Sequence, residues 1–271
     1  MAFVKITEAA SLYDDLEKKT TREMLEEMNV ENGKVILAVQ NVIPRIEELV
    51  NRMVPRMQQG GRLFYLGAGT SGRLGVLDAS EIPPTFGMSP ACVVGLIAGG
   101  EAALRRSVEN AEDDAEQGWK DLLQHQVNVL DTLVGIAASG TTPYVTGALH
   151  AARKHGILTA VLTGNPDSPA AAEADIPIEV IVGPEYVTGS SRMKSGTAQK
   201  LILNMISTSV MIKLGRVKGN RMVHMRPSNR KLVDRGVRML VEALNIPGEQ
   251  ARALLLIHGS VQQAIEKFKR E

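Results

Sequence analysis

Five short apolar segments, separated by polar loops and helical stretches, constrain the fold of this chain more than any other feature. They predict strands at residues 62–66, 91–97, 132–137, 158–162 and 176–182. The clearest helical stretch between them is 143–155, which has a proline in its first turn. Strands that alternate with helices indicate a parallel sheet covered on both faces. We therefore expect an α/β domain over residues 55–218 with a doubly wound, flavodoxin-like, five-stranded parallel sheet.

Helical patterns flank this domain on both sides. Residues 13–57 predict two helices, with a break near Asn32 and a kink or second break at Pro44. Beyond the sheet, the sequence predicts a helix at 197–214 and further helical segments at 228–244 and 249–268. The expected organisation is an N-terminal helical arm, the α/β domain and a C-terminal helical extension, over residues 1–54, 55–218 and 219–271.

Composition excludes several classes of function. The 271 residues contain 31 basic and 30 acidic side chains and only 3% aromatic residues, which argues against nucleic-acid binding driven by charge or base stacking. One cysteine, Cys92, and five histidines argue against a zinc site and a disulfide framework, so we expect no metal and no cofactor. Neither a signal peptide nor a membrane span is expected, which predicts a cytoplasmic protein without a membrane partner.

The first predicted strand ends in a glycine-rich loop at 67–72, whose sequence matches G-x-G-x-x-G. This motif opens a helix, as in dinucleotide-binding proteins. A dinucleotide site is disfavoured because the second strand lacks an acidic residue at its end, the nearest being Glu101. The hydroxyls of Thr70 and Ser71, and a second hydroxyl-rich loop at 138–142, are not explained by a dinucleotide either.

A phosphate site explains these loops better. In a flavodoxin-like sheet the first and third strands are neighbours, so loops at their C-terminal ends flank one crevice. Hydroxyls, backbone N–H groups and helix dipoles there can hold one phosphate together. The alternative is that the hydroxyls only cap helices. A third polar loop, at 183–200, follows the fifth strand. The candidate phosphate-binding residues are Thr70, Ser71, Ser139, Thr141, Thr142, Ser190, Ser191 and Lys194.

The loop at 183–200 resembles the signature of the N-acetylmuramic acid 6-phosphate etherases and of the related glucokinase regulatory protein. The resemblance covers most of residues 1–235. Further motifs that resemble the etherases lie at 66–75, 78–81, 97–101, 108–113 and 135–144. This resemblance implies a sugar isomerase (SIS) domain, a homodimer, and cleavage of the D-lactyl ether of N-acetylmuramic acid 6-phosphate. The products would be N-acetylglucosamine 6-phosphate and D-lactate, as in recycling of cell-wall amino sugars.

The same resemblance implies that Glu81 and Glu112 are the catalytic acid and base. From the sequence alone, Glu112 in its acidic cluster reads as part of a solvated helix face. Glu81 stands before Ile82 and two prolines, where partial desolvation would raise its pKa. Two other functions stay open: a non-catalytic sugar-phosphate sensor, which needs neither carboxylate, and a sugar-phosphate aldose–ketose isomerase.

The spacing of Ser71 and Glu81 raises a question about the site. If one straight helix carries both, their ten-residue separation is roughly 15 Å, too far for one sugar phosphate. Either the helix ends early and folds back at 83–84, or Glu81 acts on a ligand held by a partner chain. An apolar stripe on the 197–214 helix offers either a dimer face or ordinary packing on the sheet; it comprises Leu201, Ile202, Met205, Ile206, Val210 and Met211.

Overall fold

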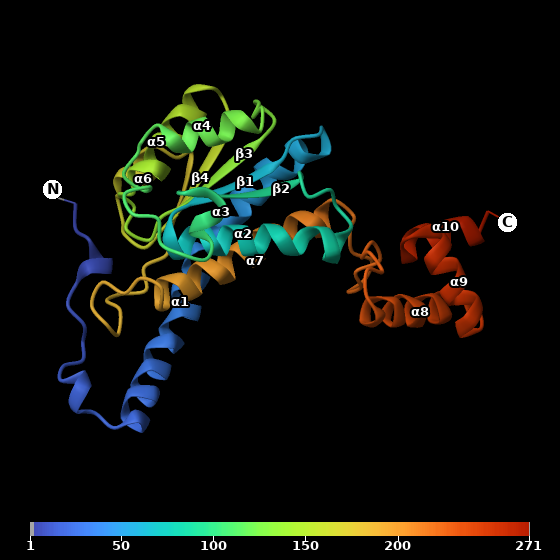
Figure 1. Ribbon diagram of the computed structural model, residues 1–271, viewed down its shortest axis with the longest axis horizontal. Coiled ribbons are helices and arrows are strands. Elements are labelled where there is room, and N and C mark those ends of the chain that lie inside the picture. The colour runs from blue at the N-terminus through green and yellow to red at the C-terminus, as the bar shows by residue number, and fades with distance from the viewer. Residues whose placement is uncertain (1–2, 271) are drawn as a thin grey trace.

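A five-stranded parallel sheet forms the centre of the computed structural model, which describes residues 3–270 (Figure 1). Its strands lie in the order β2-β1-β3-β4-β5, which confirms the predicted flavodoxin-like topology. Each predicted strand is present, and the fifth ends three residues earlier than expected. The strands are β1 (Leu63–Gly67), β2 (Val93–Ile97), β3 (Thr132–Ile136), β4 (Leu158–Thr163) and β5 (Ile176–Glu179).

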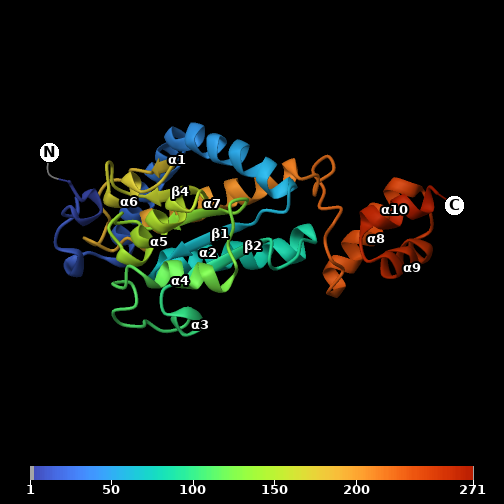
Figure 2. The same ribbon diagram turned by 90° about the horizontal axis from the view of Figure 1, so that it is seen from above.

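Helices cover both faces of the sheet (Figure 2). Because both faces are covered, β1, β3 and β4 are buried along their whole length. One face carries α1 (Thr21–Gln58), α2 (Gly69–Phe86) and α7 (Lys194–Lys213). The other carries α5 (Pro143–Lys154) with the shorter α4 (Gln117–Gln124) and α6 (Pro169–Ala172). Short helices lie at Ile6–Glu8 and Leu16–Lys18, and α3 (Gly100–Ala103) follows β2.

The N-terminal region differs from the two predicted helices. Residues Thr21–Gln58 form one helix of 38 residues with Pro44 inside it, so the predicted break near Asn32 is wrong. Thr20 and Glu23 begin the helix with a reciprocal capping box. Burial of one face on α7 and the sheet stabilises the helix where local sequence favours an interruption. The buried face includes Val35, Val39, Val42, Ile46, Leu49 and Met53.

The apolar stripe on α7 packs within its own chain. Ile202, Ile206, Val210 and Met211 are fully buried and belong to the core shared with α1 and the sheet. Of the two alternatives for this stripe, ordinary packing therefore holds for these four side chains. Met205 alone among its members is exposed, at 39%.

The C-terminal helices form a separate layer beyond the end of α2 (Figures 1 and 2). They are α8 (Arg230–Leu244), α9 (Gly248–His258) and α10 (Val261–Phe268), and they share a small core of their own. The predicted segment 249–268 is two helices because Gly259 adopts a left-handed conformation and ends the first. Across residues 3–270, no helix is both long and apolar enough to span a bilayer.

Candidate active site

Glycines bring the start of α2 close to the C-terminal ends of β1 and β3. Gly67 and Ile136 are paired in the sheet. A Cβ atom on Gly67 would lie 2.8 Å from the Gly72 nitrogen and 2.9 Å from the Ile136 carbonyl oxygen. Only glycine permits this approach of helix and strand. Close packing therefore accounts for Gly67 and Gly72 of the pattern that first suggested a dinucleotide, whereas Gly69 has a positive φ and open space around it.

The loop after β1 lies beside the loop that precedes α7. The Ser71 hydroxyl donates to the side-chain oxygen of Gln199 at 3.0 Å, and both residues are buried. A Cβ atom on Gly196 would lie 3.5 Å from Thr70 Cγ2 and 3.6 Å from the Ser191 carbonyl oxygen. Two of the three predicted phosphate loops thus meet. Gln199 lies within the predicted polar segment 183–200, but it was not among the candidate site residues.

The loop after β3 presents its hydroxyls without using them as helix caps. Ser139 Oγ accepts hydrogen bonds from the Thr141 nitrogen and hydroxyl, each at 3.2 Å. Thr142 occupies the N-cap position of α5, yet its side chain makes no capping hydrogen bond. All three side chains are partly exposed. The capping alternative therefore does not account for these hydroxyls.

Asn165 and the N-terminal segment support this loop. The Asn165 side-chain amide donates to the Ser139 carbonyl oxygen at 2.8 Å and to the Thr7 hydroxyl at 3.0 Å. Its own oxygen accepts from the Thr7 backbone nitrogen at 3.0 Å. Neither residue was predicted from the sequence. The position of Asn165 just after β4, at the same sheet edge, was a usable signal; Thr7 had none.

Two buried carboxylates, those of Glu185 and Glu31, bind the residues at the end of the loop before α7. Glu185 accepts hydrogen bonds from the backbone nitrogens of Lys194 and Ser195 at 2.8 and 2.9 Å, and so occupies the N-terminus of α7. The predicted phosphate ligand Lys194 is itself buried, and its ammonium contacts Glu31 of α1 at 2.5 Å. Ser190 and Ser191 are partly exposed in the same loop.

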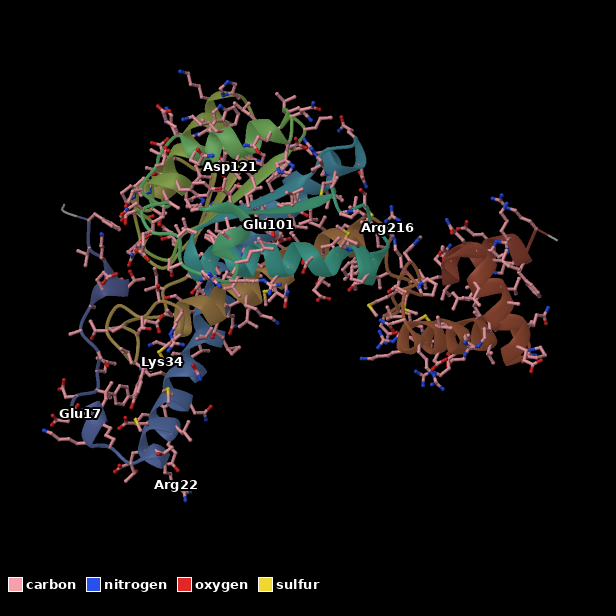
Figure 3. The ribbon with its side chains drawn as sticks, viewed as in Figure 1. Glu17, Arg22, Lys34, Glu101, Asp121 and Arg216 are labelled. Carbon is pink, nitrogen blue, oxygen red and sulfur yellow. The ribbon has the colours of Figure 1, made fainter. Side chains whose placement is uncertain are left out.

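Glu31 is the centre of a polar cluster on α1. It accepts hydrogen bonds from Lys194, Lys34 and Tyr13; Figure 3 shows Lys34 on the part of α1 that lies beside the start of α7. Burial alone would raise the pKa of the Glu31 carboxyl, but these donors outweigh it and hold the pKa below the ordinary value. Glu31 therefore fixes the position of Lys194 as an ion pair.

The hydroxyl of Ser195 also lies at this sheet edge, although the sequence did not predict it. Ser195 is 2% exposed, and within residues 3–270 its Oγ has no hydrogen-bond partner. A Cβ atom on Gly164 would lie 3.8 Å from this Oγ and 3.2 Å from the Ala138 carbonyl oxygen. Ser195 thus lies beside Gly164, whose nitrogen donates to the Ala138 carbonyl oxygen at 2.9 Å. From the sequence, its neighbour Lys194 was the predicted site residue instead.

Glu112 lies in a cavity that begins at the first phosphate loop. The cavity has a volume of about 270 Å³ and reaches from the start of α2 to the segment 107–113. The backbone oxygen of Glu112 accepts from the Tyr144 nitrogen at 3.0 Å, which ties this segment to α5. The lining residues are Ala68, Gly69, Arg73, Ala98, Ala103, Ser107, Val108, Glu109, Asn110, Ala111, Glu112 and Asp113.

Glu81 lies elsewhere. Helix α2 continues through Pro83 and Pro84 to Phe86, so the alternative in which it ends early is wrong, and Ser71 and Glu81 are separated by roughly 15 Å along its axis. Glu81 is exposed rather than desolvated. It lines a different cavity of about 240 Å³ together with Lys200 and Asn204 of α7. Within one chain, the two candidate catalytic carboxylates do not meet.

Comparison with known proteins agrees with this architecture. Residues 45–153 match the glucokinase regulatory protein N-terminal SIS domain, and residues 114–209 match the SIS domain. Among solved structures, a phosphoheptose isomerase from Francisella tularensis aligns with a TM-score of 0.57 over 72% of this chain and 100% of its own, at 18% identity. A phosphoheptose isomerase from Neisseria gonorrhoeae aligns with a TM-score of 0.54 over 70% and 98%, also at 18% identity. These likenesses confirm the predicted SIS fold.

Curated relatives are far closer in sequence. The N-acetylmuramic acid 6-phosphate etherase of Bacteroides fragilis is 69% identical over 99% of this chain and 95% of its own length. The etherase of the same name from Porphyromonas gingivalis is also 69% identical, over 99% of this chain and 98% of its own. Identity at this level over nearly the whole of both chains confirms the resemblance that the motifs carried. The chain belongs to the family of N-acetylmuramic acid 6-phosphate etherases.

Proposed function

We propose that this protein cleaves the D-lactyl ether of N-acetylmuramic acid 6-phosphate and releases D-lactate and N-acetylglucosamine 6-phosphate. The observation that carries the proposal is the cavity shared by Glu112 and the start of α2. In this cavity the Glu112 carboxylate lies beside the N-terminus of α2, which is suited to bind the phosphate of a substrate. The etherase names of the relatives supply the substrate. Since sugar phosphates are held in the cytoplasm, we propose that location for the activity.

The 6-phosphate, in this proposal, is held at the sheet edge that carries all three loops. Ser71, Ser139 and Ser191 come from the loops after β1, β3 and β5. The N-termini of α2 and α5 add backbone N–H groups and the positive ends of two helix dipoles. Lys194 contributes through its ion pair with Glu31, which shapes the third loop. This anchoring leaves the sugar ring to extend toward Glu112.

Two carboxyl groups suffice for the reaction. Opening of the sugar ring exposes an aldehyde at C1, which acidifies the proton on C2. One carboxylate removes that proton, and the second, protonated, donates to the ether oxygen as the C3–O bond breaks and lactate leaves. Water then adds to C3 of the unsaturated aldehyde, and C2 regains a proton. Proton transfer accompanies both the breaking of the C3–O bond and the addition of water, which is the work of positioned general acids and bases.

We propose that the second carboxylate is Glu81 of a partner subunit in a homodimer. The straight course of α2 supports this arrangement, because it holds Glu81 away from the phosphate loops of its own chain. The outer faces of α1 and α7 carry exposed apolar side chains that a partner would bury. They include Ile36, Leu37, Ile43, Met205 and Ile212.

The direct test is incubation of the purified protein with N-acetylmuramic acid 6-phosphate. We expect equimolar D-lactate and N-acetylglucosamine 6-phosphate, and no lactate from the unphosphorylated sugar. An aldose–ketose isomerase would instead convert an aldose phosphate into a ketose phosphate without releasing lactate. A sensor would bind the sugar phosphate and leave it intact.

A further inference from the structure

We propose that Arg73 binds the carboxylate of the substrate's lactyl group, an assignment that rests on the proposed etherase function. Arg73 lies in the cavity that contains Glu112. Among the described residues that line this cavity, Arg73 is the one positively charged side chain. The negatively charged ones are Glu109, Glu112 and Asp113. An anionic group of the substrate other than its phosphate, such as the lactyl carboxylate, therefore has Arg73 as its complementary partner in this cavity.

Helix geometry aims Arg73 at the same cavity as the phosphate loop. It follows Gly69 by four residues, so the two share one face of α2 and lie about 6 Å apart along the axis. The Arg73 Nε atom donates to the Leu104 carbonyl oxygen at 3.1 Å. Within residues 3–270, Arg73 forms no ion pair. The Leu104 contact orients the guanidinium, and its terminal nitrogens are left for a ligand.

The chemistry of the substrate supplies the matching group. N-acetylmuramic acid 6-phosphate carries the phosphate on C6 and a lactyl carboxylate on the ether oxygen at C3. C3 is bonded to C2, where the proton is removed, so the lactyl carboxylate lies near the catalytic glutamate. Three acidic side chains in the same cavity would repel it without a counter-charge. A guanidinium binds a carboxylate through two parallel hydrogen bonds and fixes its orientation.

This assignment gives Arg73 a role in choosing substrate over product. N-acetylglucosamine 6-phosphate keeps the phosphate and the acetamido group but lacks the lactyl carboxylate. The loops at Ser71 and Ser139 would contact both molecules, whereas Arg73 would contact the substrate alone. Loss of Arg73 therefore weakens substrate recognition and leaves product affinity unchanged.

The test compares two substrates and two variants. The first substrate is N-acetylmuramic acid 6-phosphate, and the second is its lactamide analogue, in which a neutral amide replaces the carboxylate. We expect wild type to favour the acid over the amide in kcat/KM by about tenfold or more, typical of a hydrogen bond between charged groups. Arg73→Gln should lose this preference, and Arg73→Lys should retain part of it.

Controls separate this role from a structural one. Arg106→Gln removes an exposed arginine of the neighbouring segment that lies outside the cavity lining, and it should keep the wild-type preference. Arg73→Gln should bind N-acetylglucosamine 6-phosphate within about twofold of wild type. An unchanged preference for the acid in Arg73→Gln, or an equal loss of product binding, overturns the assignment. Wild type that cleaves neither substrate would overturn the etherase function itself, and this assignment with it.

Discussion

Glu31 and Lys194 form a buried ion pair across 163 residues of sequence, with the Lys194 ammonium 2.5 Å from the Glu31 carboxylate. Both side chains are at most 3% exposed. The pair joins the N-terminal part of α1 to the first residue of α7, shortly after the hydroxyls of Ser190 and Ser191. The long N-terminal helix thus holds a loop of the proposed phosphate site in place.

Removing one partner should destabilise the protein. Glu31→Gln leaves the Lys194 ammonium buried without a counter-charge, and loss of one partner from such a pair costs about 3 kcal/mol. We expect that fall in the free energy of unfolding, measured with urea, and a raised KM for the phosphorylated sugar. Glu26→Gln is the matched control: Glu26 pairs with Arg22 on the exposed face of the same helix, at 2.9 Å. It should change neither quantity measurably.

The same pair predicts how stability depends on pH. Hydrogen bonds from Lys194, Lys34 and Tyr13 outweigh burial and lower the pKa of Glu31 from its ordinary value of 4.5. Because the pKa of Glu31 is lower in the folded state than in the unfolded state, its ionised carboxylate stabilises the folded protein fully above pH 4.5. This stabilisation is lost as the pH falls through the pKa that Glu31 has in the folded protein. Unfolding measured between pH 7 and pH 3 should show a smaller decline in Glu31→Gln than in wild type. Parallel declines would contradict the role given to this carboxylate.

Ser139→Ala tests the shared phosphate site. The Ser139 hydroxyl lies in the loop after β3, and within residues 3–270 its hydrogen bonds are those with Thr141 of the same loop. Its removal should raise KM for N-acetylmuramic acid 6-phosphate several-fold, since a hydrogen bond to a charged group is lost, and leave the fold intact. Ser89→Ala, an exposed serine in the turn before β2, should leave KM unchanged. An unaltered KM in Ser139→Ala would remove this loop from phosphate binding.

The two glutamates should each be needed for turnover. Glu112→Gln and Glu81→Gln should each lower lactate release by about 10² to 10⁴-fold, the usual contribution of a general acid or base. Both variants should still bind N-acetylglucosamine 6-phosphate. Glu116→Gln, which alters an exposed carboxylate near the same acidic cluster, is the control and should keep full activity. Wild-type rates in either variant would remove that glutamate from the mechanism.

Labelled water locates the bond that breaks. Reaction in water enriched in ¹⁸O should place the label at C3 of N-acetylglucosamine 6-phosphate, because elimination breaks the bond between C3 and the ether oxygen. Mass spectrometry of both products makes the measurement. Label found only in lactate would show that the other side of the ether oxygen is cleaved, and would contradict the proposed elimination.

Local sequence patterns predicted the sheet. Most of the features that were not predicted depend on contacts between segments that are distant in the sequence. Alternating strands and helices carry their signal within a few residues, so the five strands and the helix at 143–155 were predictable. The continuity of α1 past Pro44 depends on packing against α7, which no local pattern records. The pairing of Lys194 with Glu31 likewise joins distant segments, and lysine in a polar loop reads first as an anion ligand. Asn165, beside a predicted strand end, was the one supporting residue within reach.

Mixing two inactive variants tests whether the site is shared between subunits. One variant is Ser71→Ala/Ser139→Ala, which impairs the phosphate loops, and the other is Glu81→Gln. If Glu81 serves the partner's ligand, a mixed dimer contains one site with intact loops and an intact glutamate, and lactate release should return. Self-mixed samples of each variant are the controls, and exchange is checked by native mass spectrometry of differently tagged chains. Confirmed exchange without recovered activity would place Glu81 at the loops of its own chain, against the roughly 15 Å that α2 sets between them.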